Sequence, residues 1–179
     1  MKAPFVVSML ALVSAAYAVE RAHAVSLPRQ SAVWAQQDLI VALHDLPKHY
    51  SCDDLWYKFR DVLLAIGARA DYKILPYDCN GSAPKVEVKF MLPREVSAAQ
   101  QKWADLSVTR KTVQLRPGQP ATLEASDCVL LKQMKDSLLS ALPVKVVSAQ
   151  LTCEKPQFEV SIVALAPVPL PGPKTNPTG

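Results

Sequence analysis

The chain has 179 residues, of which 50% are hydrophobic and 20% are charged, and its formal net charge is +4 at pH 7. That hydrophobic fraction is enough for a buried core, and the length suits one compact domain or two small modules that share a core. The basic residues are scattered along the sequence, whereas phosphate binding needs lysine and arginine gathered on one surface. The composition therefore argues against nucleic acid as a partner.

The amino-terminal residues 1–18 have the pattern of a secretory signal peptide. A lysine precedes an apolar run from Phe5 to about Val13, and Ala16 and Ala18 are the small residues before a cleavage point. A second site of the same kind would move the cleavage to the position after residue 24. The apolar run is too short for a bilayer-spanning helix, which needs roughly 20 residues. We therefore expect a periplasmic or secreted protein with no integral membrane span.

Two similar stretches, 51–79 and 126–153, indicate an internal duplication. Alignment of Cys128 with Cys52 superimposes the apolar positions of two helices, and alignment of Cys153 with Cys79 superimposes the strands that follow. Each unit reads as strand, helix, strand, strand. The expected helices are 52–66 and 128–142, and the expected strands are 38–46, 70–79, 84–93, 112–118, 145–153 and 158–167.

The pattern predicts an α+β fold built from two tandem β-α-β-β pseudo-repeats. We expect one continuous, antiparallel-rich sheet with both helices on one face; two small sheets packed face to face are the alternative. The chain then divides into a signal peptide (1–18), an N-terminal extension (19–35), the first repeat (36–93), a connector (94–110), the second repeat (111–167) and a proline-rich tail (168–179). We expect the tail to be extended and unstructured.

Signals for helix ends support these boundaries. Ser51 and Asp54 form an S-x-x-D start, in which the hydroxyl accepts from a backbone N–H and the acid favours the positive end of the helix dipole. Ser126 and Asp127 offer the same capping to the second helix. Gly67 follows the first helix, and a proline stands at the equivalent place after the second.

The four cysteines of an exported chain point to disulfides rather than to a metal site, since none of the short spacings typical of zinc ligands is present. Four cysteines allow three pairings. A helix over 52–66 rises roughly 21 Å, and a strand returning over 72–79 covers roughly 23 Å, so the strand ends beside the start of the helix. This geometry predicts the disulfides Cys52–Cys79 and Cys128–Cys153, with each repeat closed by its own bridge.

The first helix has an aromatic flank beside its core-facing stripe, whereas the second helix is polar at the corresponding positions. We expect this flank to bind another envelope or secreted protein, because tryptophan and tyrosine dominate binding energetics. The expected contact residues are Trp56, Tyr57, Arg60 and Leu64. The alternative is that Trp34, or the segment 94–106 with Trp103, folds over the flank and buries it within the chain.

Two histidines suggest a different function. His44 and His49 lie among acids in HDLPKHYSCDD and could bind a metal or act as an acid/base pair, so a metal-dependent or acid/base hydrolase is the main alternative. Asp53 and Asp54 are, however, explained as acids of the first helical turn. An inhibitor of an extracellular hydrolase is a third possibility. The sequence has no nucleophile elbow, phosphate-binding glycine loop or HExxH motif, so we expect neither a cofactor nor enzymatic activity.

Overall fold

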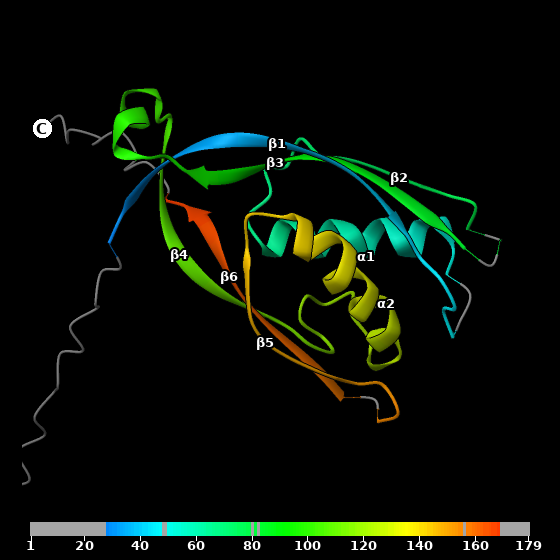
Figure 1. Cartoon of the computed structure of the whole chain (residues 1–179). Coiled ribbons are helices and arrows are strands. Elements are labelled where there is room, and N and C mark those ends of the chain that lie inside the picture. The colour runs from blue at the N-terminus through cyan, green and yellow to red at the C-terminus, as the bar shows by residue number, and fades with distance from the viewer. Residues whose placement is uncertain (1–27, 48–49, 80, 82, 156, 169–179) are drawn as a thin grey trace, which may run out of the picture.

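The computed structural model describes residues 28–47, 50–79, 81, 83–155 and 157–168. The expected signal peptide and residues 169–179 of the expected tail lie outside this part of the chain. The elements, in chain order, are β1 (Gln30–Ala42), α1 (Cys52–Ala65), β2 (Lys73–Tyr77), β3 (Lys85–Glu95), the 3₁₀ helix η1 (Ala98–Trp103), β4 (Leu106–Leu115), the 3₁₀ turn η2 (Ala125–Asp127), α2 (Cys128–Gln133), the π-helical segment η3 (Met134–Leu139), β5 (Lys145–Thr152) and β6 (Gln157–Pro167) (Figure 1).

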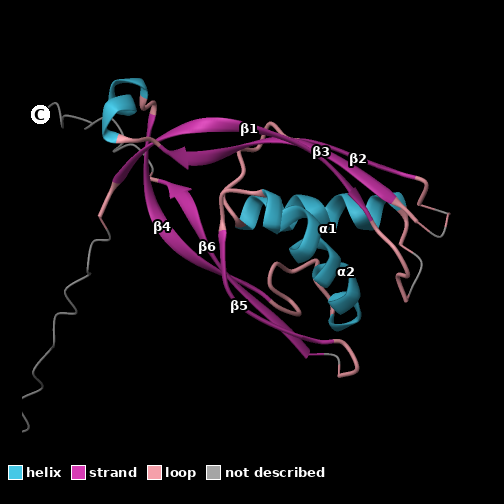
Figure 2. Ribbon diagram, viewed as in Figure 1, coloured by secondary structure: helices cyan, strands magenta, loops and turns pink. Residues whose placement is uncertain are grey.

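The strands form one six-stranded sheet in the order β2-β3-β1-β4-β6-β5, with antiparallel pairing throughout. The expected α+β fold with a continuous antiparallel sheet is therefore confirmed. Only three residue pairs, Gln30–Ala32 with Leu106–Val108, join β1 to β4. On either side of this junction the sheet diverges into a first wing, β2-β3-β1, and a second wing, β4-β6-β5. Figure 2 shows both helices on the concave side, between the wings.

Two elements begin earlier than the sequence pattern indicated. The structure starts β1 at Gln30, inside the segment expected to be an extension, and the segment expected to be a connector contains η1 and the first part of β4. Ala32 is fully buried, but it begins the continuous apolar run AVWA (32–35), which lacks the alternation of a half-buried strand. Backbone pairing with both β3 and β4 defines this stretch as a strand at the junction of the wings.

Helix α1 has the expected beginning, and its end requires a glycine. The Asp54 amide donates to Ser51 Oγ at 3.0 Å and the Ser51 amide donates to Asp54 Oδ2 at 3.1 Å, which completes the capping box. Gly67 has a φ of +93°, and a Cβ placed on it would lie 2.5 Å from the carbonyl oxygen of Leu165 in β6. Residue 67 must therefore be glycine both for its backbone conformation and for the close approach of α1 to the second wing.

The second helical segment differs from the regular helix expected over 128–142. After the short α2, the chain widens into the π-helical η3 and returns to a helical turn at 140–141. Ser137 and Ser140 donate their hydroxyls to the carbonyls of Gln133 and Asp136 within the same segment. Such side-chain bonds compete with the regular helical ladder. Nonetheless, the apolar residues of α1, α2, η3 and both wings pack into one core cluster.

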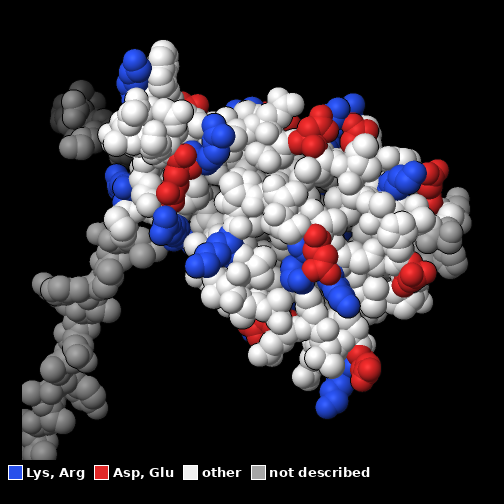
Figure 3. Space-filling model, viewed as in Figure 1, with Lys and Arg blue, Asp and Glu red and all other residues white. Residues whose placement is uncertain are grey.

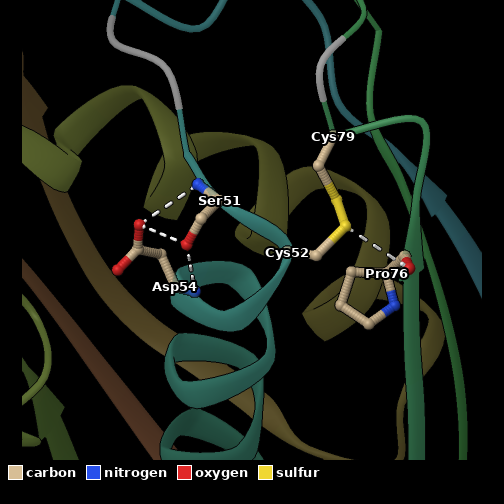
Figure 4. The surroundings of a disulfide bond; sticks show 5 residues. All are labelled: Ser51, Cys52, Asp54, Pro76 and Cys79. Carbon is tan, nitrogen blue, oxygen red and sulfur yellow. Dashed lines mark hydrogen bonds between the residues drawn. A yellow bond between two sulfur atoms is a disulfide. The ribbon is translucent and has the colours of Figure 1, made fainter.

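Both predicted disulfides are confirmed. The bridge Cys52–Cys79 joins the start of α1 to the residues just after β2, and Cys128–Cys153 joins the start of α2 to the residue after β5, with Cα–Cα distances of 5.5 and 5.4 Å. Figure 4 shows the first bridge beside the capping box, where Cys52 Sγ lies 3.6 Å from the Pro76 carbonyl oxygen. Each bridge closes within one β-α-β-β set of elements. An origin of the two sets by duplication stays a prediction.

Candidate functional site

The aromatic flank of α1 forms a compact cluster, which we call the α1 surface: Trp56, Tyr57, Arg60 and Leu64. The rings of Trp56 and Tyr57 meet edge to face, with centroids 5.0 Å apart. The guanidinium carbon of Arg60 lies 5.1 Å from the Trp56 ring centroid and 4.9 Å from that of Tyr57. Arg60 also donates to Asp61 Oδ1 at 2.6 Å. These contacts hold the arginine on the rings by cation–π attraction and by an adjacent carboxylate.

The members of the α1 surface are not equally exposed. Tyr57 is 47% exposed and Leu64 is 41% exposed. They stand seven residues apart, so they share one face of the helix. Trp56, by contrast, is half-buried, packs against the core and meets the ring of Tyr72 at 6.3 Å. The exposed surface therefore centres on Tyr57, Arg60 and Leu64, with Trp56 as its support. Sequence reasoning missed Tyr72, which lies in the loop after the helix.

The aromatic residues expected as an internal cover do not bury the α1 surface, although Trp34 lines one depression together with Leu64. Trp34 receives the guanidinium of Arg69 at 5.5 Å from its ring centroid. Trp103, in η1, is 69% exposed and has the ammonium of Lys102 5.1 Å from its ring centroid. Tyr57 and Leu64 keep their exposure in the presence of both segments, so the described part of the chain leaves this face open.

The histidine pair does not form a described site. His44 is exposed in the loop after β1, and its backbone amide donates to Gln133 Oε1 at 2.7 Å while its carbonyl accepts from the same side chain. His49 lies outside the described residues. Among the residues that the structure describes, no group of three or more His, Cys, Asp or Glu side chains could hold a metal ion.

A buried ion pair connects α1 to the segment before α2. Asp127 is fully buried, Lys58 is 6% exposed, and Lys58 Nζ lies 2.6 Å from Asp127 Oδ2. The same ammonium donates to the Thr122 carbonyl at 2.6 Å. The Tyr50 hydroxyl donates to the other oxygen of Asp127 at 2.9 Å. The sequence could have indicated that Lys58 needs a buried counter-ion, since it is an ionisable residue beside the core-facing stripe of the helix, but not that the counter-ion is Asp127.

Asp127 caps the 3₁₀ turn η2, which continues directly into α2, and not α2 itself as expected from the sequence. Its Oδ2 atom accepts from the Glu124 amide at 2.7 Å, at the start of η2, and no side-chain cap bond to α2 is formed within the described structure. A carboxylate that holds a buried ammonium satisfies a charge that burial would otherwise make costly. The ion pair is thus a structural link between the two halves of the core.

We expect the free energy of unfolding to fall at alkaline pH, because the Tyr50 phenol is buried and donates to Asp127 in the folded protein. Burial of the phenol raises the pKa of Tyr50 above its ordinary value, and the negative charge of Asp127 and the hydrogen bond to it raise the pKa further. In the unfolded chain a tyrosine ionises near pH 10. Above that pH the unfolded state holds fewer protons than the folded state, so the free energy of unfolding falls by up to about 1.4 kcal/mol per pH unit.

The variant Tyr50→Phe tests this expectation. It should lose about 1.5 to 3 kcal/mol at neutral pH, because a hydrogen bond to a charged group is removed. Between about pH 9 and 11 its stability should fall less steeply than that of the wild type, because the ionising group is gone. Urea unfolding followed by tryptophan fluorescence measures both effects. Parallel slopes for the two proteins would contradict the assignment to Tyr50.

Comparison of this chain with known protein families, curated proteins and solved structures found no match. In the part of the chain that the structure describes, no helix has both the length and the apolar character needed to cross a bilayer.

Proposed function

We propose that this is an exported, non-enzymatic binding or assembly protein that contacts another envelope or secreted protein through the α1 surface. The observation that carries the proposal is the pairing of exposed Tyr57 and Leu64 around Arg60 on one helix face. Tyrosine and arginine are enriched among the residues that contribute most to protein interfaces. The signal-like residues 1–18 and the two closed disulfides support export, since such bridges persist in oxidising compartments.

The attachment of α1 at three points favours a binding role. Its start is held by the capping box and by the bridge Cys52–Cys79, its middle by the ion pair of Lys58, and its end by the close approach of Gly67 to β6. A partner that docks on such a helix orders little backbone, so less conformational entropy is lost on binding. The same attachment keeps Arg60 and Tyr57 in a fixed relation to each other.

Site-specific photo-crosslinking in the native host tests the proposal. A photoreactive residue at position 57 or 64 should capture the same protein, whereas the same residue at Ile40 or Val147, which are exposed apolar positions on strands, should not capture it. With the purified partner, Tyr57→Ala combined with Leu64→Ala should weaken binding more than tenfold. Trp56 is left unchanged because its half-buried ring packs on the core.

The matched control is Ile40→Thr combined with Val147→Thr, which removes exposed apolar side chains from strands and keeps β-branched residues there. It should bind the partner as the wild type does. Equal capture from positions 40 and 147, or unchanged affinity of the α1 variant, would refute the proposal. If the α1 variant instead unfolds at a lower urea concentration than the control, then these side chains belong to the core and the proposal also fails.

A further inference from the structure

An open depression of about 540 Å³ lies where the end of β3 meets β4, β6 and the start of β5. It is lined by Arg94, Glu95, Arg110 and Lys145, and by apolar residues of β6 and of the turn before β5. Figure 3 shows basic side chains gathered around an acidic one over this region of the molecule. No residue of the α1 surface lines this depression, although a neighbouring depression shares Ala164 and Leu165 with it and is lined by Leu64.

The depression has a net positive charge. Arg110 donates to Glu95 Oε1 through Nη2 at 3.0 Å and through Nε at 3.3 Å, so these two side chains neutralise each other. Arg94 and Lys145 have no ion pair with any described residue. Two cations therefore remain available on the rim, and a second depression of about 670 Å³, which shares Arg110 and Lys145, adds Lys111.

The floor of the depression is apolar. Val163 and Leu165 lie on β6, and Pro143 and Val144 come from the turn that leads into β5. A volume of this size is in the range of small-molecule sites, which combine an apolar lining with a few polar groups that fix orientation. A simple inorganic anion would use the cations and leave the apolar floor in contact with water, whereas an uncharged apolar molecule would leave the cations unpaired.

We propose that this depression binds a single-chain anionic amphiphile, an alkyl carboxylate or alkyl phosphate. The headgroup pairs with Arg94 and Lys145, and the alkyl chain lies on Val163, Leu165 and the turn before β5. Arg110 is paired with Glu95 and lies beside these two cations. The proposal does not depend on the α1 surface and adds a second, small-molecule site to the proposed binding protein.

Calorimetric titration of the mature, disulfide-bonded protein tests the proposal with five probes. Octanoate and octyl phosphate should bind, and their relative affinities show which headgroup is preferred. Acetate and inorganic phosphate, which lack the chain, and octyltrimethylammonium, which reverses the charge, should bind at least tenfold more weakly. Added salt should weaken octanoate binding, because part of the attraction is between solvent-exposed charges.

Variants that remove the unpaired cations test whether the probes bind in this depression. Arg94→Gln combined with Lys145→Gln should weaken octanoate binding about tenfold, because two exposed ion pairs are lost. The control Lys73→Gln combined with Lys132→Gln removes the same charge from exposed positions on β2 and α2 and should leave the affinity unchanged. Equal losses in the two double variants, equal binding of octyltrimethylammonium, or no binding of octanoate and octyl phosphate would overturn the proposal. Binding to phosphatidylglycerol vesicles without binding of the single-chain probes would also overturn it.

Discussion

Replacement of Asp127 by alanine should lower the free energy of unfolding by about 3 to 5 kcal/mol, because it leaves the buried ammonium of Lys58 without its counter-ion. Lys58 Nζ lies 2.6 Å from Asp127 Oδ2, and the carboxylate is fully buried. The Thr122 carbonyl, the other acceptor of this ammonium, is a neutral group and cannot replace the lost charge. The same substitution removes the hydrogen bond from the Tyr50 hydroxyl to Asp127 Oδ1.

Urea unfolding of three variants separates this effect from simple loss of an acid. Asp136→Ala removes an exposed carboxylate from the same helical segment and should change stability by no more than about 0.5 kcal/mol. Lys58→Met combined with Asp127→Asn removes both charges and keeps an acceptor for Tyr50, so it should recover a large part of the loss. If Asp127→Ala costs no more than Asp136→Ala, the ion pair does not stabilise the fold.

The ion pair has this importance because the two wings share little backbone pairing. Three residue pairs between β1 and β4 are the whole of their ladder. The contacts of Lys58 with Thr122 and Asp127, together with the common core cluster, therefore hold the first wing and its helix to the second. We expect both halves to unfold in one cooperative transition, and Asp127→Ala should keep that transition while shifting its midpoint.

Features that depend on short stretches of sequence were predictable. The start of α1 follows from Ser51 and Asp54, and its end from Gly67, because capping bonds and positive φ angles involve residues only a few positions apart. The two disulfide pairings followed from the lengths of a helix and its returning strand. In each case the controlling geometry lies within one unit of the fold.

Features that depend on distant residues were not predictable from the pattern. Lys58 meets Asp127 across 69 positions, and no local rule connects them. The exposure of Tyr57 and the half-burial of Trp56 are decided by Tyr72 and the core, although both rings lie on the same helix flank. The basic depression is likewise hidden in the sequence, because β3, β4 and β5 each contribute one of its cations.

Each disulfide should contribute about 3 to 4 kcal/mol in the chain-entropy description, because the bridges close loops with sequence separations of 27 and 25. Cys52→Ala with Cys79→Ala, and Cys128→Ala with Cys153→Ala, should therefore destabilise the protein by similar amounts. The quadruple variant should lose about 6 to 8 kcal/mol. That loss is comparable to the total stability of a typical domain, roughly 5 to 15 kcal/mol. Urea midpoints of the three variants give the comparison.

Loss of each bridge should increase amide hydrogen exchange in a different helix. Cys52 is the first residue of α1 and lies beside the capping box. Its removal should therefore increase amide hydrogen exchange in the first turn of the helix, which precedes Tyr57. Cys128 is the first residue of α2, and the helical segment that follows already departs from regular helical bonding at η3. Its removal should therefore increase amide hydrogen exchange in α2 and at the end of β5, while the amides of α1 stay protected. A variant of the second bridge that loosens α1 as much as a variant of the first would show that the bridges act through the whole core. In that case the α1 surface would depend on global stability, and its fixed geometry could not be assigned to Cys52–Cys79.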